Sequence, residues 1–175
     1  MLPQQDLEFL QTMFDAALEA ARAYVTPSTP WPLNITMQEY AQCAACESAE
    51  ETGWGKSLPK GSNNYLGIKA TKSWTGPVVG ASGTEQNPDG SWTGPQADLW
   101  RVYANPQACF ADQLHILATA KNPDGSLIYA QALAAETPED YITAECAKWS
   151  TGLAKGQQVT IIYDNHGKMS GQGDG

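Results

Sequence analysis

A glutamate directly before a helix-ending sequence is the residue of this chain best suited to chemistry. Glu51 is followed by Thr52-Gly53-Trp54-Gly55, and Gly53 lacks the Cβ that makes a left-handed helix end costly. A carboxylate in the last helical turn faces the negative end of the helix dipole, and a neighbouring indole removes water from it. Both effects favour the protonated form. This arrangement suits a general acid near neutral pH, although an ordinary surface glutamate before a glycine cap has the same local sequence.

Two segments around Glu51 resemble the catalytic-helix motif of glycoside hydrolase family 73, the peptidoglycan N-acetylglucosaminidases. The first is Ala49–Ser57, with the sequence AEETGWGKS, and the second is Asn63–Lys69, with the sequence NNYLGIK. The segments occur in the family's order, and weaker similarity extends from about Phe9 to His166. By this resemblance, Glu51 takes the place of the family's general acid.

Two positions of the catalytic helix depart from the family's pattern. Glu50 stands where leucine is usual, and Glu47 stands where glutamine is common. Glu47 and Glu51 lie on one helix face, so we expect the site to hold two carboxylates, whose repulsion would favour protonation of one. The alternative for Glu47 and Glu50 is solvation at the rim of a cleft, which we favour for Glu50.

The resemblance also implies a second acidic residue, in a threonine-glutamate step of a β-hairpin before a glycine-x-tryptophan sequence. Thr84-Glu85 precedes Gly90-Ser91-Trp92, so Glu85 inherits this role. Asp89 and Asp98 are the competing acids of the segment. The turn sequence NPDG better explains Asp89, and a place on a strand edge is expected for Asp98.

Aromatic and amide side chains are the expected substrate contacts. An asparagine amide offers a donor and an acceptor, which matches a sugar acetamido group, although Asn63 and Asn64 could instead tie down their own loop. Trp74 and Trp92 lie in two copies of the pentapeptide SWTGP and suit either a sugar-stacking platform or a cross-strand pair. Trp149 stands where the resemblance implies a site tyrosine, and an indole can stack and donate but cannot act as a phenol. The expected substrate-binding residues are Trp54, Asn63, Asn64, Tyr65, Trp92, Tyr129 and Trp149.

The resemblance implies an α+β, lysozyme-like fold, with a mostly helical lobe and a small β-hairpin lobe in one catalytic domain over residues 1–175. Local patterns predict matching elements. Apolar residues at a helical period span Leu7–Tyr24, and Thr36–Glu39 form a capping box for a helix to about Glu51. Residues 71–100 change to glycine, proline, threonine and tryptophan, which predicts the hairpin. The remaining expected elements are a pairing of 77–86 with 91–100, helices at 106–120, 129–135, 137–148 and 157–166, and a flexible tail at 167–175.

The composition suits one globular domain of 175 residues, 42% hydrophobic and 17% charged. A net charge of −9 and a pI near 4.5 argue against nucleic acid as a partner. No stretch approaches the roughly 20 apolar residues that cross a bilayer, so no membrane span is expected. The start, MLPQQDLEFL, lacks the basic and apolar regions of a signal peptide. We therefore expect either a removed leader or another export route, such as that of phage endolysins or injected effectors.

Four cysteines, Cys43, Cys46, Cys109 and Cys146, lack the paired doublets of a zinc site. Small buried thiols are the favoured interpretation, and one or two disulfides or a metal site are the alternatives. The sequence contains no phosphate loop, dinucleotide motif or metal-binding motif, so neither a cofactor nor a metal ion is expected. The two histidines are far apart in the sequence, which argues against a catalytic triad.

With the resemblance, these features predict a monomeric hydrolase that acts on peptidoglycan at the bacterial cell wall. It would cut the β-1,4 bond between N-acetylglucosamine and N-acetylmuramic acid, with Glu51 protonating the leaving oxygen. Glu85 could then activate water or attack the sugar, or the substrate's 2-acetamido group could be the nucleophile. Two alternatives stay open. One is a lytic transglycosylase, which needs one glutamate and yields anhydro products, and the other is an inactive wall-binding module.

Overall fold

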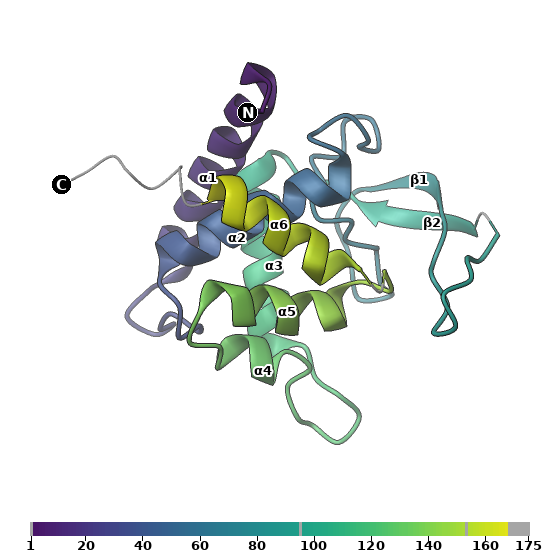
Figure 1. The fold of residues 1–175 in the computed structure, drawn as a ribbon. Coiled ribbons are helices and arrows are strands. Elements are labelled where there is room, and N and C mark those ends of the chain that lie inside the picture. Colours follow the sequence, from purple (N-terminus) through teal and green to yellow (C-terminus); the bar gives the residue numbers. More distant parts are fainter. Residues whose placement is uncertain (1, 95, 153, 168–175) are drawn as a thin grey trace.

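A computed structural model of the chain describes residues 2–94, 96–152 and 154–167. The described residues form six helices and one antiparallel pair of strands, arranged as in Figure 1. The elements are α1 (Gln4–Tyr24), α2 (Met37–Thr52), β1 (Val78–Gly83), β2 (Gln96–Arg101), α3 (Pro106–Thr119), α4 (Ala130–Leu133), α5 (Pro138–Trp149) and α6 (Lys155–His166). The predicted combination of a mostly helical part with a small hairpin is confirmed.

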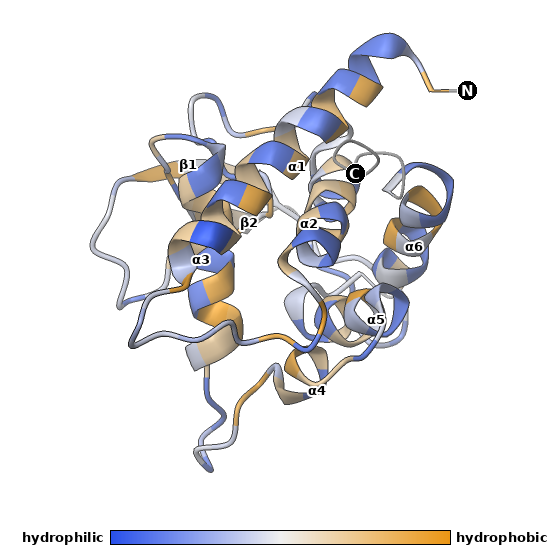
Figure 2. Cartoon of the chain, turned by 90° about the vertical axis from the view of Figure 1, so that its left-hand side faces the viewer, coloured by the Kyte–Doolittle hydropathy of each residue, from blue (hydrophilic) through white to orange (hydrophobic). Residues whose placement is uncertain are grey.

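Helix α2 lies at the centre of the helical part. Figure 2 shows it between α1 and α3 on one side and α5 and α6 on the other, and it packs directly against α1, α5 and α6. Its middle is built from small side chains, because Ala41, Ala44, Ala45 and Ala49 are all buried there. Small side chains let neighbouring helices approach closely at the density of a protein interior. Residues from several elements can therefore surround the end of α2.

Both ends of α2 are fixed by local signals that the sequence carries. Thr36 accepts a hydrogen bond from the backbone N–H of Glu39, and the Glu39 carboxylate accepts one from the Thr36 N–H, which is the predicted capping box. At the other end, Gly53 has a φ of +54°, and its N–H points back to the carbonyls of the last turn. The helix therefore ends at Thr52 and leaves Glu51 in its last turn.

The hairpin projects from the helical part, at the right of Figure 1. Val78–Gly83 pairs with Gln96–Arg101 in antiparallel register, and an isolated bridge joins Gln86 to Trp92. The turn at 87–90 closes with a backbone hydrogen bond of 2.9 Å. The predicted hairpin and turn are confirmed. The ladder is shorter than predicted, because side-chain hydroxyls accept two of the backbone N–H groups that follow β1.

Two helices begin earlier than the sequence predicts. Helix α1 starts at Gln4, directly after Pro3, and α6 starts at Lys155 rather than at residue 157. A proline at the start of a helix has no N–H to leave unpaired, so α1 can begin there. Of the predicted tail, residues 168–175 lie outside the described part of the chain. None of the described helices combines the length and the apolar character that crossing a lipid bilayer requires.

The four cysteines are free and buried. The interpretation as buried thiols is confirmed, and the disulfide alternative is wrong. Burial raises the pKa of Cys46 and of Cys109 to about 12, so both stay protonated at neutral pH.

Candidate active site

Glu51 lies at a cavity between the helical part and the hairpin. The cavity has a volume of about 450 Å³, and the last turn of α2, the loop after it and both strands form its walls. Gly67 comes from that loop, Ser82 from β1 and Trp100 from β2. The Glu51 side chain is 24% exposed, and it is the one carboxylate among the described residues that line the cavity. A substrate in this space would therefore meet a single acid.

Gly67 and Trp100 set the position of the Glu51 carboxylate. Gly67 has a φ of +64°, and a Cβ at this residue would lie 3.2 Å from Oε2 of Glu51 and 3.5 Å from Cζ3 of Trp100. The carboxylate and the indole thus both lie against the Gly67 backbone, which requires glycine for its conformation and for the close approach. The sequence suggested Trp54 as the indole beside Glu51, but Trp54 does not line the cavity.

The Trp100 indole also reaches the hairpin. A Cβ at Gly83 would lie 3.4 Å from Cζ2 of Trp100 and 3.2 Å from a carboxylate oxygen of Asp98. The ammonium of Lys69 is 5.6 Å from the centre of the ring. The indole N–H is buried and has no hydrogen-bond partner among the described residues. Trp100 therefore lies between Glu51 and the charged residues of the hairpin.

Glu85 is held by a lysine and a hydroxyl and is not among the residues that line the Glu51 cavity. Its carboxylate accepts hydrogen bonds from the Lys69 ammonium and from the Thr151 hydroxyl. The bond from Lys69, and then that from Thr151, hold the pKa of Glu85 below its ordinary value, so it is a carboxylate at neutral pH. Lys69 also lies 2.9 Å from Asp98. Because Thr151 belongs to the connection between α5 and α6, Glu85 ties the hairpin to the helical part.

A buried cluster of charged side chains lies behind Glu51. The ammonium of Lys155, at the start of α6, is 2.8 Å from Oε1 of Glu47 and also donates to Glu51. Gln113 of α3 donates to Glu47 at 2.9 Å and to Glu145 at 3.4 Å. Glu47 is 3% exposed, so the alternative that placed it on a solvated cleft rim is wrong. It is instead an internal partner of Lys155.

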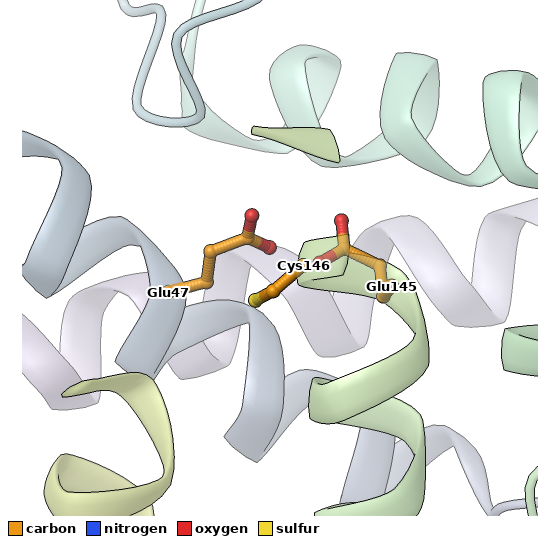
Figure 3. Close-up of side chains that lie close together, drawn as sticks. All are labelled: Glu47, Glu145 and Cys146. Carbon is orange, nitrogen blue, oxygen red and sulfur yellow. The ribbon is translucent and has the colours of Figure 1, made fainter. Parts of the chain in front are cut away.

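Figure 3 shows Glu47 of α2 beside Glu145 and Cys146 of α5. One possible ligand atom from each residue lies within 4.8 Å of the other two, so a metal ion could find ligands there. Such an ion would compete with the ammonium of Lys155, which already pairs with Glu47. Burial, and then the charge of Glu47, raise the pKa of Glu145 well above its ordinary value. The protonated form of Glu145 is therefore favoured, which makes the group a poor cation site.

The asparagines of the loop after α2 bond to the backbone of that loop and of residues 101 and 103. Asn64 donates to the carbonyls of Ile68 at 2.8 Å and Arg101 at 3.0 Å, and it accepts from the Ile68 N–H at 2.9 Å. Asn63 donates to the carbonyl of Tyr103 at 2.9 Å. This geometry is that of the loop-clamp alternative. Contact of either amide with a sugar stays a prediction.

The aromatic residues predicted to bind substrate lie in different environments. Tyr65 packs against a phenylalanine ring of α1, with ring centres 6.1 Å apart. Trp149 donates to the carbonyl of Leu66 at 3.0 Å and packs against Tyr129, with ring centres 5.8 Å apart. Trp92 is 62% exposed on the hairpin. Among all the predicted substrate contacts, only Asn64 lines the Glu51 cavity, and the roles of the others stay predictions.

Sequence reasoning missed two residues of the site, Trp100 and Lys155. Trp100 ends the predicted hairpin, so its place near the loop was visible, whereas its contact with Gly67 depends on the fold. Lys155 gave no signal, because it lies 104 residues after Glu51 and looks like an ordinary solvated lysine at a helix start. Its burial follows from the packing of α6 against α2.

Comparisons with known proteins show which family and which solved structures this chain resembles. The family model for glucosaminidase, described as mannosyl-glycoprotein endo-beta-N-acetylglucosaminidase, matches residues 33–166. The structure is similar to that of a mutant peptidoglycan hydrolase from Sphingomonas sp. A1, with a TM-score of 0.71 and 22% identity. That alignment covers 94% of this chain and 97% of the other.

Two further solved structures are similar. A C-terminally truncated glycoside hydrolase domain of FlgJ from Salmonella typhimurium has a TM-score of 0.61 and 25% identity, covering 91% of this chain and 96% of the other. The catalytic domain of the autolysin Auto from Listeria monocytogenes has a TM-score of 0.70 and 18% identity, covering 95% and 86%. These likenesses confirm the lysozyme-like fold. The search of curated proteins gave no match.

Proposed function

This chain belongs to the glucosaminidase family of glycoside hydrolases, and on that premise we propose that it cleaves the β-1,4 bond between N-acetylglucosamine and N-acetylmuramic acid in peptidoglycan. Glu51 is the general acid. The observation that carries the proposal is the position of Glu51, the one carboxylate among the described residues that line the cavity between the two lobes. Peptidoglycan as the substrate is supported by structural neighbours that are themselves named peptidoglycan hydrolases.

Glu51 gives its proton to the glycosidic oxygen as the bond breaks and the sugar becomes an oxocarbenium-like ion. Gly67 and Trp100 fix the carboxyl group on the cavity side, and Lys155 fixes it from behind. A group held in place in this way needs little reorientation before it reacts. The Trp100 indole also lines the cavity, so it offers the bound sugar an apolar wall beside the acid.

The second half of the reaction can use Glu85 or the substrate itself. Glu85 is charged, but Lys69 and Thr151 hold it outside the lining of the Glu51 cavity. To act as a base or a nucleophile, it would need the hairpin to move. The 2-acetamido group of the substrate needs no such movement, so the arrangement described here favours it as the nucleophile.

A lytic transglycosylase is the second candidate, because it too needs only one glutamate at the cavity. Hydrolysis leaves a reducing end that carries the oxygen of water, whereas transglycosylation leaves an anhydro ring without it. Mass spectrometry of fragments released in isotope-labelled water separates the two reactions. A labelled reducing end supports the hydrolase.

Glu51→Gln on purified peptidoglycan tests the proposal. The amide keeps the shape of the side chain but has no proton to give, so we expect a loss of activity of about 100-fold or more. The circular dichroism spectrum and binding to cell walls should be retained. Glu50→Gln, on the same helix but outside the cavity lining, is the matched control and should stay active. Near wild-type clearing of cell walls by Glu51→Gln would sink the assignment.

The site of action is the bacterial cell wall, where this substrate occurs. We propose that the enzyme works there as a monomer, which sedimentation of the active protein would check. If the wild-type protein bound walls without releasing fragments, a wall-binding module would be the better description.

A further inference from the structure

Lys155 is the one buried lysine in the described ranges, and it lies between two carboxylates. Its Nζ pairs with Glu47 at 2.8 Å and also with Glu51, and its side chain is 3% exposed. Glu51 is the partner that reaches the cavity, whereas the Glu47 side chain is only 4% exposed. One ammonium therefore joins the cavity acid to an internal acid.

The charges of this cluster do not balance if every group is ionised. Glu47, Glu51 and Glu145 offer three negative charges against the single positive charge of Lys155. A buried charge without a counter-ion is strongly unfavourable, so such groups take up protons instead. Burial and the charge of Glu47 raise the pKa of Glu145, which favours its protonated form. Glu47 and Glu51 then compete for the single ammonium of Lys155.

Among the described residues, the other groups around the cluster supply no second cation to it. The titratable residues coupled to it are Tyr40, Cys43 and Glu50 from α2, Cys109 from α3, Tyr141 and Cys146 from α5, and Tyr129 before α4, and Lys56 lies on the cavity side. Lys56 is paired with Asp6 at 3.4 Å. Burial alone would lower the pKa of Lys155, but the charges of Glu47 and Glu51 raise it well above its ordinary value. Lys155 therefore stays charged throughout the neutral range.

We propose that Lys155 and Glu47 are positioning residues that set the upper pH limit of activity. Glu47 serves as the counter-ion of Lys155, which leaves Glu51 free to carry the proton that it donates. This inference rests on the proposed role of Glu51 as general acid. Without Glu47, the ammonium would have Glu51 as its only charged close partner and would favour its carboxylate form. Without Lys155, burial and the nearby carboxyl groups would favour the protonated form of Glu51 at higher pH.

The pH dependence of kcat/KM in two variants tests the inference, with the full chain and soluble peptidoglycan fragments. In Glu47→Gln, the alkaline limb of the profile should move to lower pH by about one unit or more, because Glu47 no longer repels the charge of Glu51 or competes with it for the ammonium of Lys155. In Lys155→Met, the methionine fills the space of the lysine stem without its charge, and the limb should move to higher pH. Lys148→Met, on the exposed end of α5, is the matched control and should keep the wild-type limb.

Opposite shifts of the two limbs support the inference. Limbs that stay at the wild-type pH in both variants, or that move in the same direction, overturn it. Melting temperatures check that each variant folds, and if Lys155→Met does not fold, the direction of the limb in Glu47→Gln decides alone. A failure of the proposed function looks different, because Glu51→Gln would then be active.

Discussion

Asn64→Ala should destabilise the protein far more than the loss of one polar side chain at a cavity suggests. Asn64 is 2% exposed, and its amide makes three hydrogen bonds to backbone groups. These bonds join the loop after α2 to the end of β2, since one goes to Arg101 and two go to Ile68. Alanine would remove all three and leave backbone groups without these partners.

The loss of stability depends on which of these backbone groups keep another hydrogen-bond partner. The carbonyl of Ile68 also accepts from the Arg101 N–H at 3.1 Å, so it keeps a partner, whereas the Ile68 N–H loses the acceptor that Asn64 provides. A buried group without its partner costs about 1–3 kcal/mol, and each lost bond to a group that keeps a partner costs about 1 kcal/mol. We therefore expect a loss of about 3–5 kcal/mol, which lowers the melting temperature by roughly 6–20 °C in a domain of this size.

Thermal unfolding followed by circular dichroism measures this change. Asn122→Ala is the matched control, because Asn122 bonds to Ser126 in an exposed turn, and it should shift the melting temperature by only about 1–2 °C. Activity well below the melting temperature should fall less than about tenfold if the amide is a clamp. A variant that melts with the wild type but loses kcat/KM would refute the clamp and restore Asn64 as a sugar contact.

Two further changes test the cavity and the hairpin. Gly67→Ala would place a Cβ 3.2 Å from the Glu51 carboxylate. Gly53→Ala is the control, because it adds a Cβ at a φ of +54° in open space, and kcat should fall at least about tenfold further in Gly67→Ala. Equal losses of kcat would mean that backbone strain alone matters. The pKa of Glu85 is lower in the folded protein than in the unfolded chain, where it is about 4.3. The pairing of Glu85 with Lys69 therefore stabilises the hairpin at pH values above about 4.3, and this stabilisation is lost as the pH falls through the pKa of the folded protein. In Glu85→Gln, the backbone amides of residues 78–101 should therefore exchange hydrogen faster already at neutral pH. In the wild type, we expect the same increase only in acid, once the rates are corrected for the intrinsic effect of pH. Equal protection of the hairpin in both proteins at neutral pH would contradict this.

The elements of the fold could be predicted wherever their signals are local. The capping box at Thr36 and the glycine at residue 53 specify both ends of α2 within a few residues of sequence. The hairpin turn at 87–90 was equally plain. The extent of the strand ladder was not, because it depends on a hydroxyl of Thr151, which is far away in the sequence. Helix starts were missed by two or three residues for the same reason, since packing rather than propensity decides them.

The residues of the site likewise fall into those that local sequence signals predict and those that only the fold brings together. Glu51 could be placed from sequence, because the signals that end its helix are close along the chain. Asn64 was identified, but whether its amide serves the loop or a sugar was open. Its three backbone partners favour the loop, and contact with a sugar stays a prediction. The neighbours of Glu51 from β2 and α6 could not be predicted, since nothing local distinguishes a lysine that will be buried from one that will be solvated.

The burial of Lys155 changes how Glu47 should be interpreted. Taken alone, Glu47 looked like a second acid placed to repel Glu51. With an ammonium between the two carboxylates, the dominant force on each is attraction to Lys155, and the repulsion becomes a competition for one counter-ion. Neither residue makes sense without the other: a lone Glu47 would be an uncompensated buried charge, and a lone Lys155 would pair with the acid that must give up a proton. A joint exchange of the two residues, which are 108 positions apart, should therefore destabilise the protein by less than the sum of the two single exchanges.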